Sequence, residues 1–292
     1  MRGPGDTICR MACAKNLVPD GPPAYMKGMK RWIPFLKSEK TVAVVRLSGV
    51  ISAGNRGLSD EKIGPVLEKA FSKGKPSAVA LIINSPGGSP VQSSLIGARI
   101  RRLSDEKSVP VFAFVEDVAA SGGYWLAAAA DEIYADQSSV LGSIGVISAG
   151  FGLEDFIARH GVHRRVYTAG TSKSMLDPFK AENPEDVDRL KTILEQIHHV
   201  FIDHVKTRRA GKLDADQDLF NGEVRIGAQA VKAGLADGLG HMKTVMKDRF
   251  GEKCNFRTYG VKRGLLGRFG ASAAEGMAGA VEERIEFARY GL

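Results

Sequence analysis

The stretch AVALIINSPGGS, residues 78–89, joins an unbroken apolar run to a turn rich in proline and glycine. A short apolar run that ends in such a turn predicts a strand buried on both faces of a sheet. Apolar residues at helical spacing follow from about Val91 to Leu103, so the turn connects a strand to a helix. Strand–turn–helix units of this kind are typical of a parallel sheet covered by helices.

The same unit recurs along the central part of the chain. The predicted strands are Thr41–Leu47, Val109–Val115 and Ile133–Ala135, and predicted helices begin near Ser59, Tyr124 and residue 185, the last running to residue 209. A second Gly-rich turn, residues 119–123, precedes the Ala-rich helix Tyr124–Ala130. Together these patterns predict an α/β fold with a mostly parallel sheet flanked by helices.

Three parts of the chain differ in composition. Residues 1–40 are punctuated by Pro and Gly and predict a flexible tail. Within it, residues 29–36 combine cations with Trp32 and Phe35, which suits a membrane interface as well as packing on the domain or on a neighbouring subunit. Residues 41–245 carry the strand and helix patterns of the predicted globular domain. Residues 246–292 form a Gly- and Ala-rich tail that ends in a charged helical pattern at Glu282–Tyr290.

Composition excludes several classes of function. The chain has 292 residues, a formal net charge of +8 and 43% hydrophobic residues, typical of a globular protein. The positive excess lies near the two ends without a basic stripe that contains aromatics, so we do not expect nucleic-acid binding. Cys9, Cys13 and Cys254 lie outside the central region, which argues against a disulfide framework or a cysteine metal site.

Membrane-spanning patterns are also missing from the sequence. No run of about 18 apolar residues occurs, as a transmembrane helix would require. The residues after Met1 lack the apolar core of a signal peptide. The sequence therefore predicts a chain that is soluble or peripheral to a membrane.

The two Gly-rich turns contain groups that acyl-transfer chemistry requires. Ser121 stands after a buried strand and a short loop and directly before a helix, which exposes its hydroxyl beside unpaired amides. In a parallel sheet both turns lie at the carboxyl edge of the strands, where ligands usually bind. Amides of the two turns could therefore hold an oxyanion, although an ordinary N-cap serine and two ordinary loops explain the same residues.

The general base could be a histidine or a lysine. None of the six histidines lies before residue 160, and no pattern nominates one for a Ser–His–Asp triad, which the sequence does not exclude. Lys173 lies in a turn-rich stretch between small hydroxyl residues. As a base its pKa must fall by about 3 units from 10.4, which burial can cause. Ser143 is a candidate to orient the amine, and a solvated lysine is the alternative interpretation.

Several segments together resemble the signal peptide peptidase A family of serine proteases. They are Ile83–Ser89, Ala119–Trp125, Gly142–Val146, the stretch Gly170–Phe179 and the closing segment Asn221–Gly240. Lys173 follows Ser121 by 52 residues (173 − 121), as in the short, single-unit members of the family. The resemblance covers about residues 41–245, which makes this part the expected peptidase domain.

The resemblance implies a ClpP/crotonase-like fold of repeated β-β-α units and a Ser–Lys dyad. Ser121 matches the nucleophile, Lys173 the general base and Ser143 the hydroxyl that orients the lysine. The lysine is contributed within one chain or by a domain repeat. In the first turn Gly88 matches an oxyanion-hole donor, as does Gly122 in the second.

The same resemblance implies the substrates and the assembly. Gly87 and Ser89 are expected to bind substrate. Members are endopeptidases that hydrolyse signal-peptide remnants and other hydrophobic or unfolded peptides, use no metal or organic cofactor, and form homo-oligomeric rings or domes. The expected location is the cytoplasm or the periphery of a bacterial inner membrane. Many members carry an N-terminal membrane anchor that this sequence lacks, so residues 29–36 are the candidate membrane contact.

Two other functions fit parts of the pattern. A crotonase-type enzyme acting on acyl-CoA shares the fold and an oxyanion hole, but would leave Ser121 and Lys173 without a role. A non-catalytic scaffold would need none of Ser121, Ser143 and Lys173, all of which are present. A thioester assay distinguishes the first alternative, and labelling by a serine-directed fluorophosphonate distinguishes the second.

Overall fold

The computed structural model describes residues 39–53, 57–170, 172–261 and 284–292. The proposed membrane-contact segment 29–36 and the cysteines Cys9 and Cys13 lie outside these residues. Residues Glu39–Leu292 cluster into one unit, in which strands and helices mostly alternate along the chain.

The strands are β1 (Thr41–Ser48), β2 (Ala78–Ser85), β3 (Val111–Ala120), β4 (Glu132–Ala135), β5 (Val140–Gly142), β6 (Val224–Ile226), β7 (Gly238–Leu239) and β8 (Asn255–Tyr259). The helices are α1 (Asp60–Ser72), α2 (Pro90–Lys107), α3 (Gly122–Ala128), α4 (Glu154–Arg159), α5 (Pro184–Arg208), α6 (Gly227–Lys232) and α7 (Met242–Phe250). In the described part of the chain, none of these helices has both the length and the hydropathy needed to cross a bilayer.

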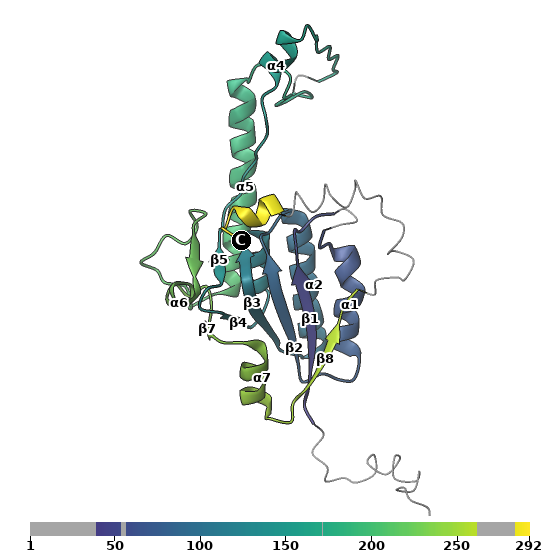
Figure 1. Ribbon diagram of the computed structural model, residues 1–292, viewed down its shortest axis with the longest axis vertical. Coiled ribbons are helices and arrows are strands. Elements are labelled where there is room, and N and C mark those ends of the chain that lie inside the picture. The colour runs from purple at the N-terminus through teal and green to yellow at the C-terminus, as the bar shows by residue number, and fades with distance from the viewer. Residues whose placement is uncertain (1–38, 54–56, 171, 262–283) are drawn as a thin grey trace, which may run out of the picture. The chain divides into compact units, whose positions relative to one another are not determined.

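The strands form one mixed sheet in the order β6-β5-β3-β2-β1-β8, with β4 beside β3 and β7 beside β4 (Figure 1). All pairs are parallel except β5 with β6. This arrangement confirms the predicted α/β class and the mostly parallel sheet flanked by helices.

The core has two layers because alternate residues of each strand point to opposite faces of the sheet. Along β1, Ala43, Val45 and Leu47 join the larger cluster, which also contains the buried sides of α1, α2 and α3. Val42 and Val44 join a smaller cluster with Met246 of α7 on the other face. The larger cluster therefore supports the helix that follows Ser121.

Strand β3 differs from the prediction, which ended it at Val115 and placed a short loop before Ser121. The strand continues to Ala120 because it changes neighbours: its first half pairs with β4 and its last three residues pair with β5. The charged residues Glu116 and Asp117 lie at the changeover, where they bond to Arg46 and Asn84. Ser121 thus follows the strand directly, and its position is fixed by the sheet.

The sheet also continues beyond residue 245, where the sequence pattern suggested a tail. Strand β8 pairs in parallel with β1 over five residues, from Asn255 to Tyr259. Its sequence NFRTY is too short and too polar to stand out, because an edge strand of this kind buries little.

Candidate active site

Two Gly-rich turns meet at the carboxyl edge of the sheet. The first follows β2 and the second follows β3, and these two strands are parallel neighbours. A Cβ atom added to Gly87 would lie 2.8 Å from the Cβ of Ser121 and 2.8 Å from the amide nitrogen of Gly122. The first turn therefore packs directly against the second, as expected from the sequence, and Gly87 is the residue that permits this approach.

Ser121 has the strained backbone that often marks functional positions. Its φ of 50° and ψ of −123° are rare for a residue with a side chain and cost about 1–3 kcal/mol. The amide of Ser121 donates to the Gly142 carbonyl at 2.8 Å, and its own carbonyl accepts from Tyr124 at 2.9 Å. Strand β5 and helix α3 thus hold the residue where its half-buried side chain lines a cavity.

The amides of Gly88 and Gly122 are available to bind an anion. Within the described residues, neither amide donates a hydrogen bond. Gly88 has a φ of 137°, and a Cβ there would fall 2.1 Å from the Ile51 carbonyl oxygen, so glycine is required. Both glycines line the same cavity as Ser121, which is the arrangement that an oxyanion hole needs.

The cavity has a volume of about 770 Å³ and both polar and apolar walls. Of the residues singled out in the sequence, Ser121, Gly122, Gly88, Ser89 and Ser143 line it, and Gly87 is a buried residue of the first turn. Apolar walls come from Ile51, Trp125, Ile197, Phe201 and Phe220. An acyl chain or peptide with apolar side chains would fit such a site.

Ser143 and the C-terminal segment meet in this cavity. Ser143 donates its backbone amide to the Glu223 carbonyl at 2.9 Å. The hydroxyl of Tyr290 lies 3.4 Å from the Oγ of Ser143 and 3.4 Å from the Pro86 carbonyl oxygen. Glu286 and Arg289 line the cavity from the same segment. Of the helix expected at Glu282–Tyr290, residues 284–288 are helical and the first residues lie outside the described part of the chain. This segment forms one wall of the site, which the sequence did not reveal.

Lys173 does not line the cavity that contains Ser121. Its side chain is exposed, in a turn where its amide donates to the Gly170 carbonyl at 3.3 Å. The turn belongs to the segment between α4 and α5, which lies at the end of α5 remote from the sheet (Figure 1). Phe201 packs near the sheet and α5 begins 17 residues earlier, which corresponds to about 25 Å of helix. One chain alone therefore does not bring Lys173 to Ser121.

Two histidines of α5 lie nearer to Ser121 than the sequence suggested. His198 lines the cavity, and its Nε2 lies 3.0 Å from the Ile144 carbonyl oxygen. The ring of His204 stacks on Trp125 with centroids 4.3 Å apart. No sequence pattern nominated either residue, because a helical pattern does not reveal what lies opposite each face.

His204 is held neutral by its surroundings. Its Nε2 lies 3.1 Å from the Trp125 carbonyl oxygen, so this nitrogen carries the proton and donates it. Burial is the main cause that lowers the pKa of His204 to about 4, and the Arg208 charge adds to it, while the bond to Trp125 opposes it. At neutral pH the uncharged ring therefore packs against the first helix turn after Ser121.

We predict that His204 makes the protein acid-sensitive. Because the folded pKa of about 4 lies below the unfolded value of 6.5, the stabilisation is complete above pH 6.5 and is lost as the pH falls towards 4. The loss amounts to about 3 kcal/mol over this range. Urea unfolding at several pH values should show this decrease in wild type and a smaller one in His204→Gln. His199→Gln, at an exposed position of the same helix, should behave as wild type; equal pH dependence in all three proteins would contradict the assignment.

Comparisons with known proteins identify a peptidase family. The model of Peptidase family S49 matches residues 104–252. A protease named SohB from Haemophilus influenzae is 30% identical over 243 residues, which cover 82% of this chain and 67% of that protein. The chloroplastic serine protease SPPA of Arabidopsis thaliana is 30% identical over 225 residues, with 73% of this chain and 32% of that protein covered.

A further relative carries a different name. A Brucella abortus protein named Na(+)/H(+) antiporter NhaA is 47% identical over 286 residues, which cover 90% of this chain. The match spans 39% of that protein, so the chain corresponds to about two fifths of its length.

Proposed function

The chain belongs to peptidase family S49, and from this premise we propose that it is a serine endopeptidase in which Ser121 is the nucleophile and Lys173 the general base. The observation that carries the proposal is the contact between the two Gly-rich turns, which puts Ser121 beside two free amides in one cavity. We do not extend the antiporter name to this chain, because protease relatives align with most of the same residues.

In the proposed reaction, the neutral amine of Lys173 takes the proton of Ser121 as the Oγ attacks the peptide carbonyl. The amides of Gly88 and Gly122 donate to the oxyanion that forms, and the protonated lysine then gives its proton to the leaving amine. Water, activated by the same lysine, hydrolyses the acyl-enzyme. Ser143 orients the lysine amine through its hydroxyl. In the single chain, the hydroxyl of Tyr290 lies beside this Ser143 hydroxyl.

We propose further that Lys173 reaches the site from a second copy of the chain in a homo-oligomer, consistent with a ring or dome. The exposed position of Lys173 supports this, because a lysine base must be dehydrated to lose its proton near neutral pH. An interface that covers the lysine turn would supply the dry environment that the single chain does not.

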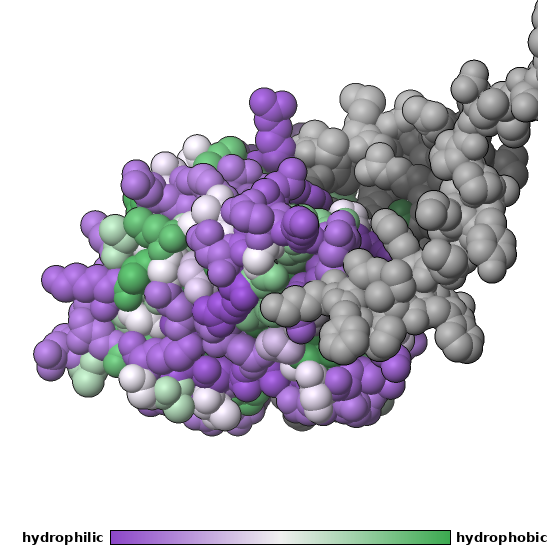
Figure 2. Space-filling model, turned by 90° about the horizontal axis from the view of Figure 1, so that it is seen from below, coloured by the Kyte–Doolittle hydropathy of each residue, from purple (hydrophilic) through white to green (hydrophobic). Residues whose placement is uncertain are grey.

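The distribution of exposed apolar side chains supports the same assembly. Around α4 and α5, large apolar residues are exposed, among them Phe151 (85%), Phe156 (60%), Tyr167 (91%) and Val200 (59%). The face shown in Figure 2 is in contrast mainly hydrophilic, with small apolar areas. Large exposed apolar patches usually mark sites of association, so we place the subunit contact on the α4–α5 segment.

We propose peptides with small or medium apolar side chains as substrates, including signal-peptide remnants and unfolded segments. The apolar wall formed by Trp125 and Phe201 supports this preference. The proposed location, in the cytoplasm or peripheral to a bacterial inner membrane, rests on the family resemblance.

The function is tested by two measurements on the wild-type protein. A fluorophosphonate probe should label Ser121, as identified by mass spectrometry of the labelled peptide. A peptide library should be cleaved mainly next to Ala or Leu. Hydrolysis of acyl-CoA thioesters without peptide cleavage would favour the crotonase alternative, and absence of labelling with no cleavage would favour a scaffold.

A further inference from the structure

The short helix α3, which begins directly after Ser121, ends in buried backbone. Ala128 and Ala129 are 0% exposed and Ala130 is 2% exposed. The last carbonyls of a helix have no partner within it, and a buried carbonyl without a partner destabilises the fold. The end of α3 therefore requires donors from other elements.

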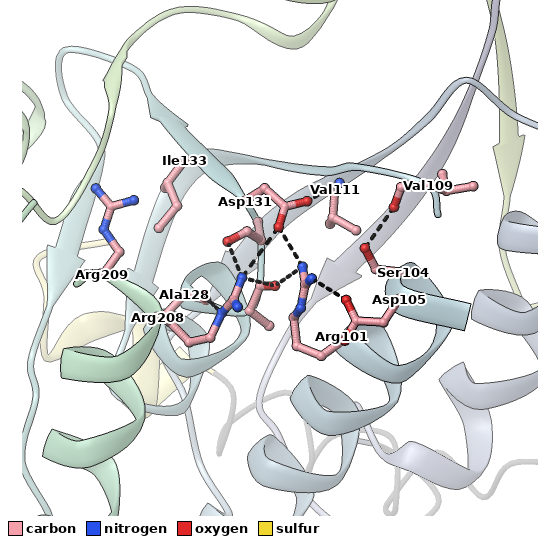
Figure 3. A network of polar contacts seen from close by, with 12 residues as sticks. Arg101, Ser104, Asp105, Val109, Val111, Ala128, Asp131, Ile133, Arg208 and Arg209 are labelled. Carbon is pink, nitrogen blue, oxygen red and sulfur yellow. Dashed lines mark hydrogen bonds and ion pairs between the residues drawn. The ribbon is translucent and has the colours of Figure 1, made fainter. Parts of the chain in front are cut away.

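Two arginines supply these donors, as Figure 3 shows. Arg208, the last residue of α5, donates from Nε to the Ala128 carbonyl at 3.2 Å and from Nη2 to the Ala130 carbonyl at 3.2 Å. Arg101 of α2 donates from Nη1 to the Ala129 carbonyl at 3.2 Å. The end of α3 is thus bound by the guanidinium groups of two helices at once.

The charges of this cluster balance locally. Asp131 accepts from Arg101 at 2.8 Å and from Arg208 at 3.5 Å, and Asp105 accepts from Arg101 at 2.8 Å. Two cations therefore face two carboxylates, a balance that Arg208→Lys keeps and Arg208→Met changes by one charge.

The same face of α5 holds α3 along its length. Phe201, His204 and Arg208 recur at spacings of three and four residues, so they share one side of the helix. The Phe201 ring lies 5.1 Å from the Trp125 ring, and the His204 ring stacks on the same indole at 4.3 Å. Arg209 turns instead to the Gly234 carbonyl and Asp237, which anchors the end of α5 itself.

We propose that Arg208 is a positioning residue for the reaction: with Arg101 it fixes the end of α3 and thereby the position of the Ser121 Oγ. The inference rests on the proposed role of Ser121. Helix α3 has seven residues, about 10 Å, so its two ends move together. The strained backbone of Ser121 persists only while its surroundings hold it. Displacement by a fraction of an ångström slows attack strongly, whereas peptide binding to the cavity walls is little affected.

The test compares Arg208→Met and Arg208→Lys with the control Arg102→Met. Arg102 is an exposed neighbour on α2 that pairs with Glu106. Titration with a fluorophosphonate counts the competent sites, and the labelling rate and kcat are then expressed per competent site. We expect Arg208→Met to lower both about 10- to 100-fold with KM within about threefold of wild type. Arg208→Lys, which retains one donor group, should recover part of the loss, and Arg102→Met should match wild type.

Each result decides the proposal. Fewer competent sites in Arg208→Met, each reacting at the wild-type rate, would mean that Arg208 only stabilises the fold and would overturn the inference. If Arg208→Met does not fold, Arg208→Lys takes its place, and a wild-type rate per site in that variant overturns the inference equally. Wild-type protein that the probe does not label at Ser121 would instead contradict the proposed function, and this role with it.

Discussion

Replacement of Ser121 by alanine is expected to lower peptide hydrolysis by at least about 10⁴-fold, because no other group can form the acyl-enzyme. The substitution keeps the Cβ atom, so the strained backbone at φ 50° stays as it is in the wild type. The bonds that hold the residue, to Gly142 and Tyr124, involve only its backbone. The free energy of unfolding, measured by thermal denaturation, should therefore change by less than about 1 kcal/mol.

The matched control is Ser138→Ala, a serine in an exposed turn whose side chain is not required for the bond from its amide to Asp136. This variant should keep wild-type activity and wild-type labelling by the fluorophosphonate. Hydrolysis by Ser121→Ala at more than one hundredth of the wild-type rate, in protein free of host proteases, would show that another group is the nucleophile.

The strands and the two turns could be predicted because their signals are local. The apolar run before Asn84 and the glycines after it determine a buried strand and a turn, and the structure places β2 and the first turn there. The end of β3 was not predictable in this way. Glu116 and Asp117 break the apolar pattern, and only the pairing with β5 shows that the strand continues through them.

Residues that act across the fold left no local signal. Arg208 and His204 lie in a helix whose pattern shows an apolar face, but not that this face packs on the helix after Ser121. Tyr290 is separated from Ser143 by 147 positions, so no pattern links the two residues. The sequence does indicate Lys173 as a chemically suitable base, yet its distance from Ser121 depends on the length and direction of α5.

Replacement of Lys173 is expected to have the second-largest effect, after that of Ser121. Lys173→Ala removes the base, and Lys173→Arg retains a cation that does not lose its proton in the accessible pH range, so each should lower activity at least about 10³-fold. Lys180→Ala, in the same exposed segment, should remain active. Activity in Lys173→Ala combined with its loss in His198→Ala would replace the dyad by a histidine base.

The origin of the lysine is decided by mixing the two inactive variants. Ser121→Ala retains Lys173, and Lys173→Ala retains Ser121, so a site that draws its serine and its lysine from different copies becomes complete in a mixed oligomer. After unfolding and joint refolding at equal amounts, random assembly should restore about a quarter of wild-type activity. A lysine used within its own chain would restore nothing, since no chain in the mixture holds both residues. Light scattering on the same samples is an independent test of the assembly. A monomeric mass at micromolar concentration would contradict the second-copy proposal. The exposed Lys173 would then have no neighbouring chain to shield it from water.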